Sequence, residues 1–233
     1  MCIRDSDDMA DFSQNYGSNE FGVGAEARIL PKTWGFLRYH YGMKDYNSYF
    51  AGTTSANDSD SKWHRVNAGL SWDPGAKLSG EVNVGYQFKK YDNSFTSTGT
   101  KREDRNTWIA ETSVTYSPFT TTSLTLNIAR AVRDTAADTN EYFDDTGIGI
   151  SLKQGIFTKF TLNAGVNYSK NEYNLPVGNA RTDDNYQANI GLDYEIQPWL
   201  GVGIGYDYRK KNSNDSSFDF TDNRFMASVK IVY

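Results

Sequence analysis

Apolar and polar residues alternate along most of the chain with a period of two. Residues 78–88 carry an apolar or small side chain at each even position and mostly polar side chains between them. The same alternation is found in residues 21–30, 160–169, 186–195 and 200–209. A period of two indicates β-strands with one apolar face, and no helical period competes with it.

The alternation predicts eleven strands, and the connections between them are alternately short turns and long loops. Eleven residues at ~3.3 Å each span roughly 28 Å at a tilt of ~40°, which is close to the apolar band of a membrane barrel. We expect the short turns on the periplasmic side and the long loops outside. The predicted strands are residues 20–30, 34–45, 63–72, 77–91, 105–117, 121–133, 143–153, 159–172, 184–195, 199–211 and 222–233. The short turns are residues 31–33, 73–76, 117–120, 154–158 and 197–198, and the long loops are about 46–62, 92–104, 134–142, 173–183 and 212–221.

Two soluble folds compete with a membrane barrel for this pattern. A propeller blade would fit four short strands into about 40–45 residues, whereas a stretch of that length here holds two long strands. A β-sandwich would have its aromatic residues near strand centres, but here they gather near strand ends, as in the aromatic girdles of a membrane protein. We therefore predict an all-β, antiparallel up-and-down transmembrane β-barrel, with eleven strands present of twelve or more.

Composition narrows the class further. The chain has 233 residues, a formal net charge of -5 and a mean hydropathy of -0.66. It contains no run of about 18 apolar residues, which excludes a transmembrane helix. The negative charge argues against a nucleic-acid partner. Cys2 is the one cysteine, so no internal disulfide can form.

The beginning of the chain does not look like the start of a barrel. Residues 1–6, MCIRDS, lack the regions of a signal peptide and resemble a translated sequencing-adapter scar. Residues 7–18 are polar, and counting strands back from the C-terminus places them in an outer loop. We expect residues 1–18 to be this leader and loop, residues 19–233 to be one barrel domain, and at least one earlier strand to be missing, because bacterial barrels have even strand numbers.

The chain ends in an alternating strand, RFMASVKIVY, that finishes on an aromatic residue. This end resembles that of bacterial outer-membrane β-barrel proteins, whose last strand is recognised by the barrel assembly machinery. The residues that match that signal are Phe225, Val229, Ile231 and Tyr233, although Phe or Trp is more usual than Tyr at the last position.

Two internal segments, SLTLNIARAVRD at 123–134 and FTLNAGVNYSKNEY at 160–173, carry a narrower resemblance. They are similar to segments of the putative β-barrel porin 2 group, and the likeness extends over residues 19–233. The resemblance implies a bacterial outer-membrane location and contact with outer-membrane lipids and lipopolysaccharide. Some members of the group sit in exopolysaccharide loci, which implies polysaccharide or small solutes as partners.

The polar face of the predicted strands carries ten cations and six anions. If this face lines an open lumen, the excess implies a weak preference for anions. Ion-paired struts that plug a narrow barrel are an equally good interpretation. Repeated glycines on this face suit a curved wall or a crowded interior. The predicted lumen-lining residues are Glu26, Arg28, Arg38, Arg65, Glu81, Lys89, Glu111, Asp207 and Arg209.

Candidates for catalysis are few. A hydrolytic barrel needs a histidine beside a carboxylate or a serine. His40 and His64 are near Asp45, Asp58 and Asp60 in the predicted topology, but the alternation points His40 inward and His64 outward. The acidic loops match no defined calcium loop. We therefore predict no catalytic residue, cofactor site or metal site.

Arg130 interrupts one apolar row. Leu124, Leu126 and Ile128 occupy successive positions of that row, and Arg130 takes the next. Either its side chain extends toward the rim of the barrel or a bulge shifts the register there, and the pattern allows both.

The function that these features favour is a porin-like passive channel, or the outer-membrane component of polysaccharide export. A structural or adhesive barrel that binds partners through its long outer loops is the alternative in another class. An outer-membrane barrel enzyme is the third and least favoured. A barrel fold is compatible with all three.

Overall fold

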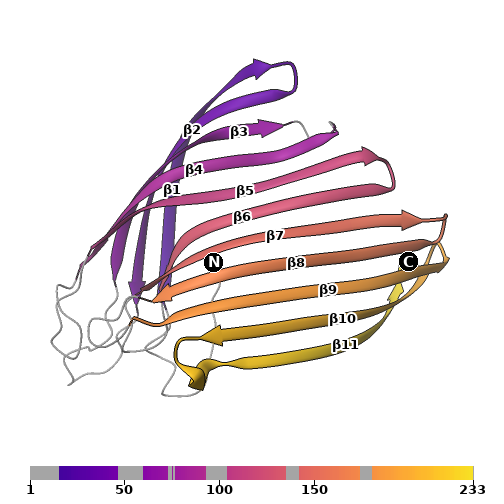
Figure 1. Cartoon of the computed structure of the whole chain (residues 1–233). Coiled ribbons are helices and arrows are strands. Elements are labelled where there is room, and N and C mark those ends of the chain that lie inside the picture. The colour runs from indigo at the N-terminus through magenta and orange to yellow at the C-terminus, as the bar shows by residue number, and fades with distance from the viewer. Residues whose placement is uncertain are drawn as a thin grey trace.

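The computed structural model describes residues 16–46, 60–72, 75, 77–92, 104–134, 142–173 and 180–232. They form one antiparallel sheet of 11 strands that neighbour each other in chain order (Figure 1). Within the described residues, no helix has the length and apolar character needed to span a bilayer. The strands are β1 (Tyr16–Leu30), β2 (Thr33–Tyr46), β3 (Ser61–Trp72), β4 (Leu78–Tyr91), β5 (Arg105–Phe119), β6 (Thr122–Asp134), β7 (Tyr142–Ile156), β8 (Phe160–Tyr173), β9 (Thr182–Gln197), β10 (Leu200–Ser213) and β11 (Phe220–Ile231), with a short 3-10 helix, η2 (Ser216–Phe218), before β11.

This meander confirms the all-β antiparallel fold class and the predicted order of strands. The predicted strand ends are correct to within a few residues. The largest difference is at β1, which begins at Tyr16 rather than at residue 20, because Tyr16 to Asn19 pair with Tyr46 to Met43 of β2 in spite of their polar composition. The expectations for residues 1–15 lie outside the described residues.

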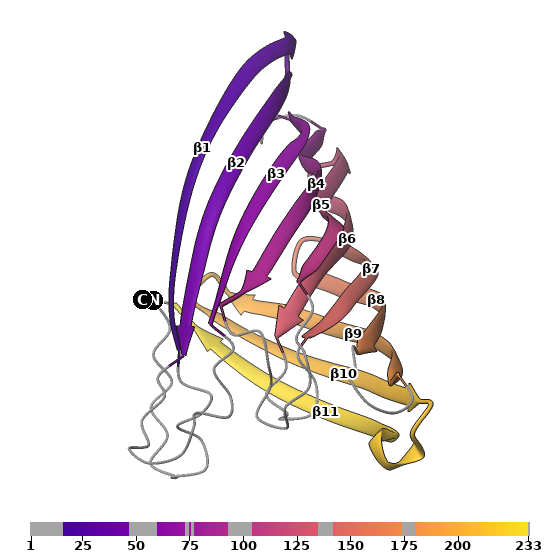
Figure 2. The same ribbon diagram turned by 90° about the vertical axis from the view of Figure 1, so that its left-hand side faces the viewer.

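The sheet is strongly curved. Figure 2 shows it curving from β1 round to β11. In the described residues, β1 pairs with β2 alone and β11 pairs with β10 alone. The curvature gives the sheet a concave face, where side chains converge, and a convex face, where they spread apart.

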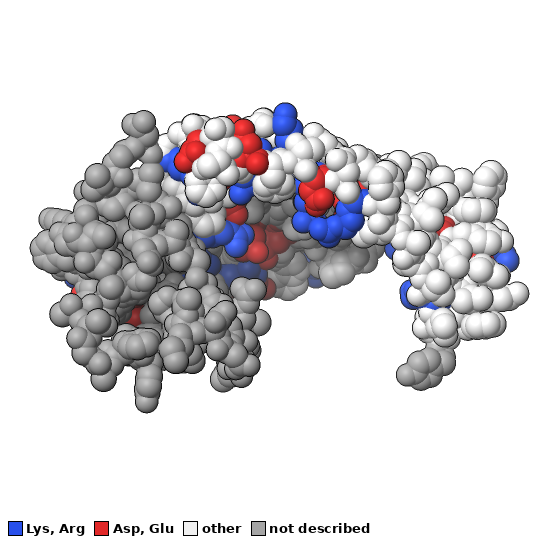
Figure 3. All heavy atoms as spheres, turned by 90° about the horizontal axis from the view of Figure 1, so that it is seen from below, with Lys and Arg blue, Asp and Glu red and all other residues white. Residues whose placement is uncertain are grey.

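The two faces differ in composition as the alternation predicts. Directly paired residues of antiparallel strands project to the same side, so the register assigns each side chain to one face. On β4, Val84 lies on the convex face and is 52% exposed, whereas its neighbour Asn83 lies on the concave face and is 8% exposed. Other exposed residues of the convex face are Val66, Ile148, Val166, Ile190 and Ile204. Figure 3 shows charged side chains gathered in the hollow.

Glycines allow the concave face to close up between β2 and β4. A Cβ atom at Gly69 would overlap the carbonyl oxygen of Val82 and the ring of Phe36. A Cβ atom at Gly85 would lie 2.8 Å from Nδ2 of Asn67. Both glycines therefore belong to a crowded interior, which is one of the two reasons expected for them.

Aromatic side chains form clusters toward both ends of the strands on the convex face. Phe160 and Tyr194 stack with ring centroids 4.6 Å apart near the short turns, and Tyr168 and Tyr186 lie 5.3 Å apart near the long loops. Aliphatic side chains occupy the band between them, as lipid contact requires.

Trp34 and Trp63 are exceptions to this girdle arrangement. Trp34 is in the concave row of Arg28, and Trp63 is in the concave row of Lys89. The expected girdles therefore include neither of these two tryptophans. Strand-end position alone could not show this, because the face depends on whether the position is odd or even.

Arg130 stays on the convex face without a bulge. The pairing of β6 with β7 is continuous from Thr122 to Asp134, so the register does not shift. The guanidinium of Arg130 lies 4.6 Å from the centroid of the Trp108 ring and donates to Asp144 at 2.8 Å. Of the two interpretations, the structure thus favours a side chain that reaches toward the loop ends, with an aromatic ring and a carboxylate as partners.

Candidate functional site

The candidate site is the concave face, which the structure builds from one row of side chains after another. All nine predicted lumen residues project to this face according to the strand register. One row runs from Glu81 through Ser113, Asn127, Gly149, Asn167 and Gln187 to Arg209. The next row places Glu111 beside Asn83, and a third places Asp207 beside Asn189. The nine predicted lumen residues thus share one face of the sheet.

Arg38 is the centre of a charged cluster on β1, β2 and β4. Its guanidinium donates to both carboxylate oxygens of Glu81 at 2.9 Å and to Glu26 at 2.8 Å. The same guanidinium lies 3.8 Å from the centroid of the Phe36 ring. A planar cation held between two carboxylates and above a ring has little freedom to move.

Amide side chains extend this cluster across β3 and β4. Asn67 donates to Asn83 at 2.8 Å, and Asn83 donates to Glu81 at 3.3 Å. Toward the loop ends, Arg65 donates to Gln87 at 3.1 Å. The part of the concave face over β1–β4 is thus a connected network, which resembles the predicted ion-paired struts.

Several members of this network were absent from the predicted lumen set. Asn67 and Gln87 could have been found from the same odd and even alternation that placed Arg65 and Glu81. Phe36 could not have been found in this way, because the pattern gives an apolar side chain no reason to lie on a polar face. Phe36 is 6% exposed, and its ring packs against the guanidinium of Arg38.

The opposite part of the concave face, over β6–β10, has a different lining. Its rows consist mainly of small and uncharged polar residues. Its side chains are more open to solvent, since Asn127, Asn167 and Asn189 are exposed, whereas Asn67 and Asn83 over β3 and β4 are buried. An added Cβ at Gly191 would meet nothing closer than 3.5 Å, in contrast to Gly69. This lining includes Thr125, Asn127, Gly149, Ser151, Gly165, Asn167, Gln187, Asn189, Gly191 and Gly205.

The register changes the charge balance that was expected for this face. It adds two cations, Arg105 and Arg224, to the ten expected. It also adds four anions to the six expected, so the excess of cations falls from four to two. The added anions are Glu20, Asp145, Asp183 and Asp222. The expected preference for anions is therefore weakened.

A second ion-paired cluster lies at the loop ends of β9 and β10. Asp183 is fully buried, pairs with Arg181 at 2.9 Å and accepts from the hydroxyl of Ser213 at 2.7 Å. Arg181 also lies 3.8 Å from the ring centroid of Phe218 in η2. These contacts attach the segment between β10 and β11 to the start of β9.

Asp215 caps η2 within this segment. It accepts hydrogen bonds from the hydroxyl of Ser217 at 2.7 Å and from its backbone N–H at 3.1 Å. Both bonds favour the carboxylate and lower the pKa of Asp215 below its ordinary value. The stabilisation is therefore present at neutral pH and is lost as the pH falls through this lowered pKa.

The two histidines lie on opposite faces, as the alternation indicated. His40 points to the concave face and lies 2.9 Å from Glu20, whereas His64 points to the convex face and lies 2.6 Å from the hydroxyl of Tyr39. They therefore do not meet at one site. Among the described residues, no group of three or more His, Cys, Asp or Glu could hold a metal ion.

The assembly-signal residues lie along the convex face of β11. Phe225 is 81% exposed, and Val229 and Ile231 are also exposed. Phe225 packs against Tyr206 with ring centroids 4.9 Å apart. Tyr233 lies outside the described residues. The signal for assembly remains a prediction.

A curved antiparallel meander with an apolar convex face and a polar concave face defines the wall of an outer-membrane β-barrel. Residues 14–233 match the family described as Putative beta-barrel porin 2, and the chain belongs to this family. The protein is accordingly located in the bacterial outer membrane.

Solved structures share the fold at low sequence identity. The FrpB iron transporter from Neisseria meningitidis is 11% identical with a TM-score of 0.67, over 95% of this chain and 42% of that chain. The outer membrane channel DcaP of Acinetobacter baumannii is 13% identical with a TM-score of 0.59, over 99% of this chain and 67% of that one. The chain thus spans less than half the length of the first of these structures. The search of curated proteins finds no match.

Proposed function

We propose that this protein is a porin-like passive channel for polar solutes. The observation that carries the proposal is the arrangement of all nine predicted lumen residues on one concave face, opposite an apolar convex face. Where the polar groups of such a face are not bonded to one another, they require water or a polar solute, since unsatisfied polar groups are costly inside a membrane.

The two parts of the concave face point to different roles. The network around Arg38 and Glu81 packs against β1–β4 and stiffens the wall there. The lining over β6–β10 is less crowded and offers mainly amide and hydroxyl groups. Such a lining suits uncharged solutes with many hydroxyl groups, including sugar chains, so it supports the outer-membrane step of polysaccharide export as the finer form of the proposal.

Conductance of the folded protein in a planar lipid bilayer tests this proposal. We expect stable open-channel currents with a reversal potential close to zero in a salt gradient, because cations and anions of the lining nearly balance. Replacing Asn167 with Glu should shift the reversal potential toward cation preference. Replacing Arg38 with Ala should have a smaller effect on selectivity if the solute passes along β6–β10.

The outcomes separate the interpretations of the concave face. A larger selectivity change in Arg38→Ala than in Asn167→Glu would place the route along β1–β4 instead. The absence of any channel activity would contradict the proposal and favour the structural or adhesive barrel. In the part of the chain that the structure describes, His40 pairs with Glu20 and His64 pairs with the hydroxyl of Tyr39. Neither pair by itself supports the enzyme alternative.

A further inference from the structure

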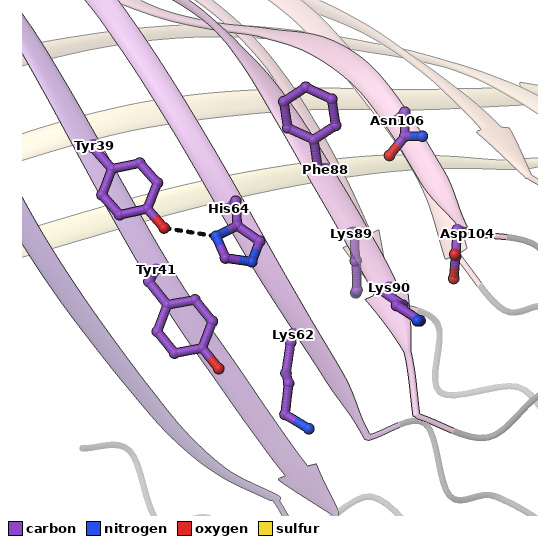
Figure 4. Close-up of a pocket in the computed structure, with 9 residues that line it drawn as sticks. All are labelled: Tyr39, Tyr41, Lys62, His64, Phe88, Lys89, Lys90, Asp104 and Asn106. Carbon is purple, nitrogen blue, oxygen red and sulfur yellow. Dashed lines mark hydrogen bonds between the residues drawn. The ribbon is translucent and has the colours of Figure 1, made fainter.

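A cavity on the convex face has a lining that the channel function does not explain. It has a volume of about 760 Å³ and lies at the loop ends of β2–β5 (Figure 4). Because the convex face contacts lipid, this cavity opens toward the membrane and not toward the concave site. Its lining residues are Tyr39, Tyr41, Lys62, His64, Phe88, Lys89, Lys90, Asp104 and Asn106.

The aromatic part of the lining is held in place by its own contacts. The hydroxyl of Tyr39 and Nδ1 of His64 are 2.6 Å apart, and the rings of Tyr41 and His64 lie 5.1 Å apart. Figure 4 shows Tyr39 pointing toward His64 from the neighbouring strand, Tyr41 beside it on the same strand as Tyr39, and Phe88 on the next strand. Rings at this level of a barrel lie where acyl chains meet headgroups.

Two lysines stand directly opposite each other at the loop end of the cavity. Lys62 of β3 is the register partner of Lys90 of β4, and both project to the convex face. Like charges in this arrangement repel each other. Asp92 neutralises Lys62 at 2.8 Å, and Asp104 accepts from the backbone N–H of Tyr91 at 3.3 Å. Among the described residues, no ion pair or hydrogen bond is made by the ammonium of Lys90.

The position of these lysines matches the expected depth of lipid phosphates. In the described strands, every cation on the convex face lies in the half nearer the long loops, and the half nearer the short turns carries none. These cations are Lys62, Lys90, Arg130, Lys170 and Lys210. Below the cavity on the same strands, Val66 and Val84 are exposed. One site thus offers a cation for a headgroup and apolar surface for acyl chains.

We propose that this cavity binds the phosphorylated headgroup of an outer-leaflet glycolipid. Lys90 contacts the phosphate, Lys62 assists it, and Tyr39, Tyr41 and Phe88 contact the sugar and the first part of the acyl chains. The site is independent of whether the barrel conducts solutes, because it lies on the other face of the wall.

Binding of lipid A to the folded protein in detergent, measured by native mass spectrometry, tests the proposal. We expect Lys90→Glu to weaken binding by at least about fivefold, because reversal of one headgroup contact replaces attraction with repulsion. Lys32→Glu makes the same charge change in a short turn at the opposite end of the barrel and should leave binding unchanged. Dephosphorylated lipid A should bind the original protein as weakly as phosphorylated lipid A binds Lys90→Glu.

Each alternative has a distinct outcome. Equal weakening by Lys32→Glu would show that overall charge governs binding, and would overturn the site. Competition by inorganic phosphate at concentrations similar to those of lipid A would identify free phosphate as the ligand and would also overturn it. Heat-modifiable mobility on gels checks that each variant is folded. If Lys90→Glu does not fold, Lys90→Gln is used in its place, and it should weaken binding by a smaller factor.

Discussion

Replacing Val166 with Arg should destabilise the folded barrel by about 2–4 kcal/mol, as expected for a cation on the lipid face near the middle of the membrane. Val166 is 60% exposed on the convex face, in the centre of β8. Arginine there would bring an unpaired charge into the apolar band. The free energy of unfolding in lipid vesicles, measured by denaturant titration, checks this expectation.

The adjacent residue provides a matched control. Asn167 lies on the concave face and is exposed, with Gly149 and Gln187 as its register partners, so a longer side chain can extend into open space. Asn167→Arg should therefore cost less than about 1 kcal/mol. Equal loss of stability in the two variants would contradict the assignment of faces. Asn83 would be a poorer control beside Val84, because it is 8% exposed and accepts a hydrogen bond from Asn67.

Replacing Gly69 with Ala should destabilise the barrel by about 1–3 kcal/mol through overpacking. The new methyl group would overlap the carbonyl oxygen of Val82, which is backbone and cannot easily move, and also the Phe36 ring. Moving the ring would disturb Arg38, which lies above it. Denaturant unfolding measures the change in stability.

Gly191→Ala is the control for this prediction. An added Cβ there makes only an ordinary contact, 3.5 Å from the carbonyl oxygen of Ile204. Since alanine restricts the unfolded chain more than glycine does, this variant should be neutral or more stable by about 0.5–1 kcal/mol. If Gly69→Ala were as stable as Gly191→Ala, the close packing of β2, β3 and β4 would be refuted.

Alternation along each strand was enough to predict the faces, but not the partners within a face. It placed Arg38 and Glu81 on the same side because their positions have the right parity in their own strands. It could not show that Arg38 reaches Glu81 across β3, since this depends on the register between strands. The cross-strand pairing of Lys62 with Lys90 was hidden for the same reason.

Residues that break the alternation were the hardest to place. Phe36 is apolar on a polar face, and Arg130 is charged on an apolar face. In each case a neighbouring side chain explains the exception. Arg38 of the same strand lies against Phe36 and also binds Glu81 of β4, and Asp144 of β7 pairs with Arg130. A sequence shows such an exception but not the neighbour that stabilises it.

The assignment of a lipid-facing convex face and a wet concave face is tested most directly by cysteine labelling along β9. The background would be Cys2→Ser, and single cysteines would replace Gln187, Ala188, Asn189 and Ile190 in the protein inserted in lipid vesicles. A water-soluble maleimide should label positions 187 and 189 and leave positions 188 and 190 protected by lipid. Equal labelling at all four positions, or labelling of 188 and 190 alone, would contradict the account.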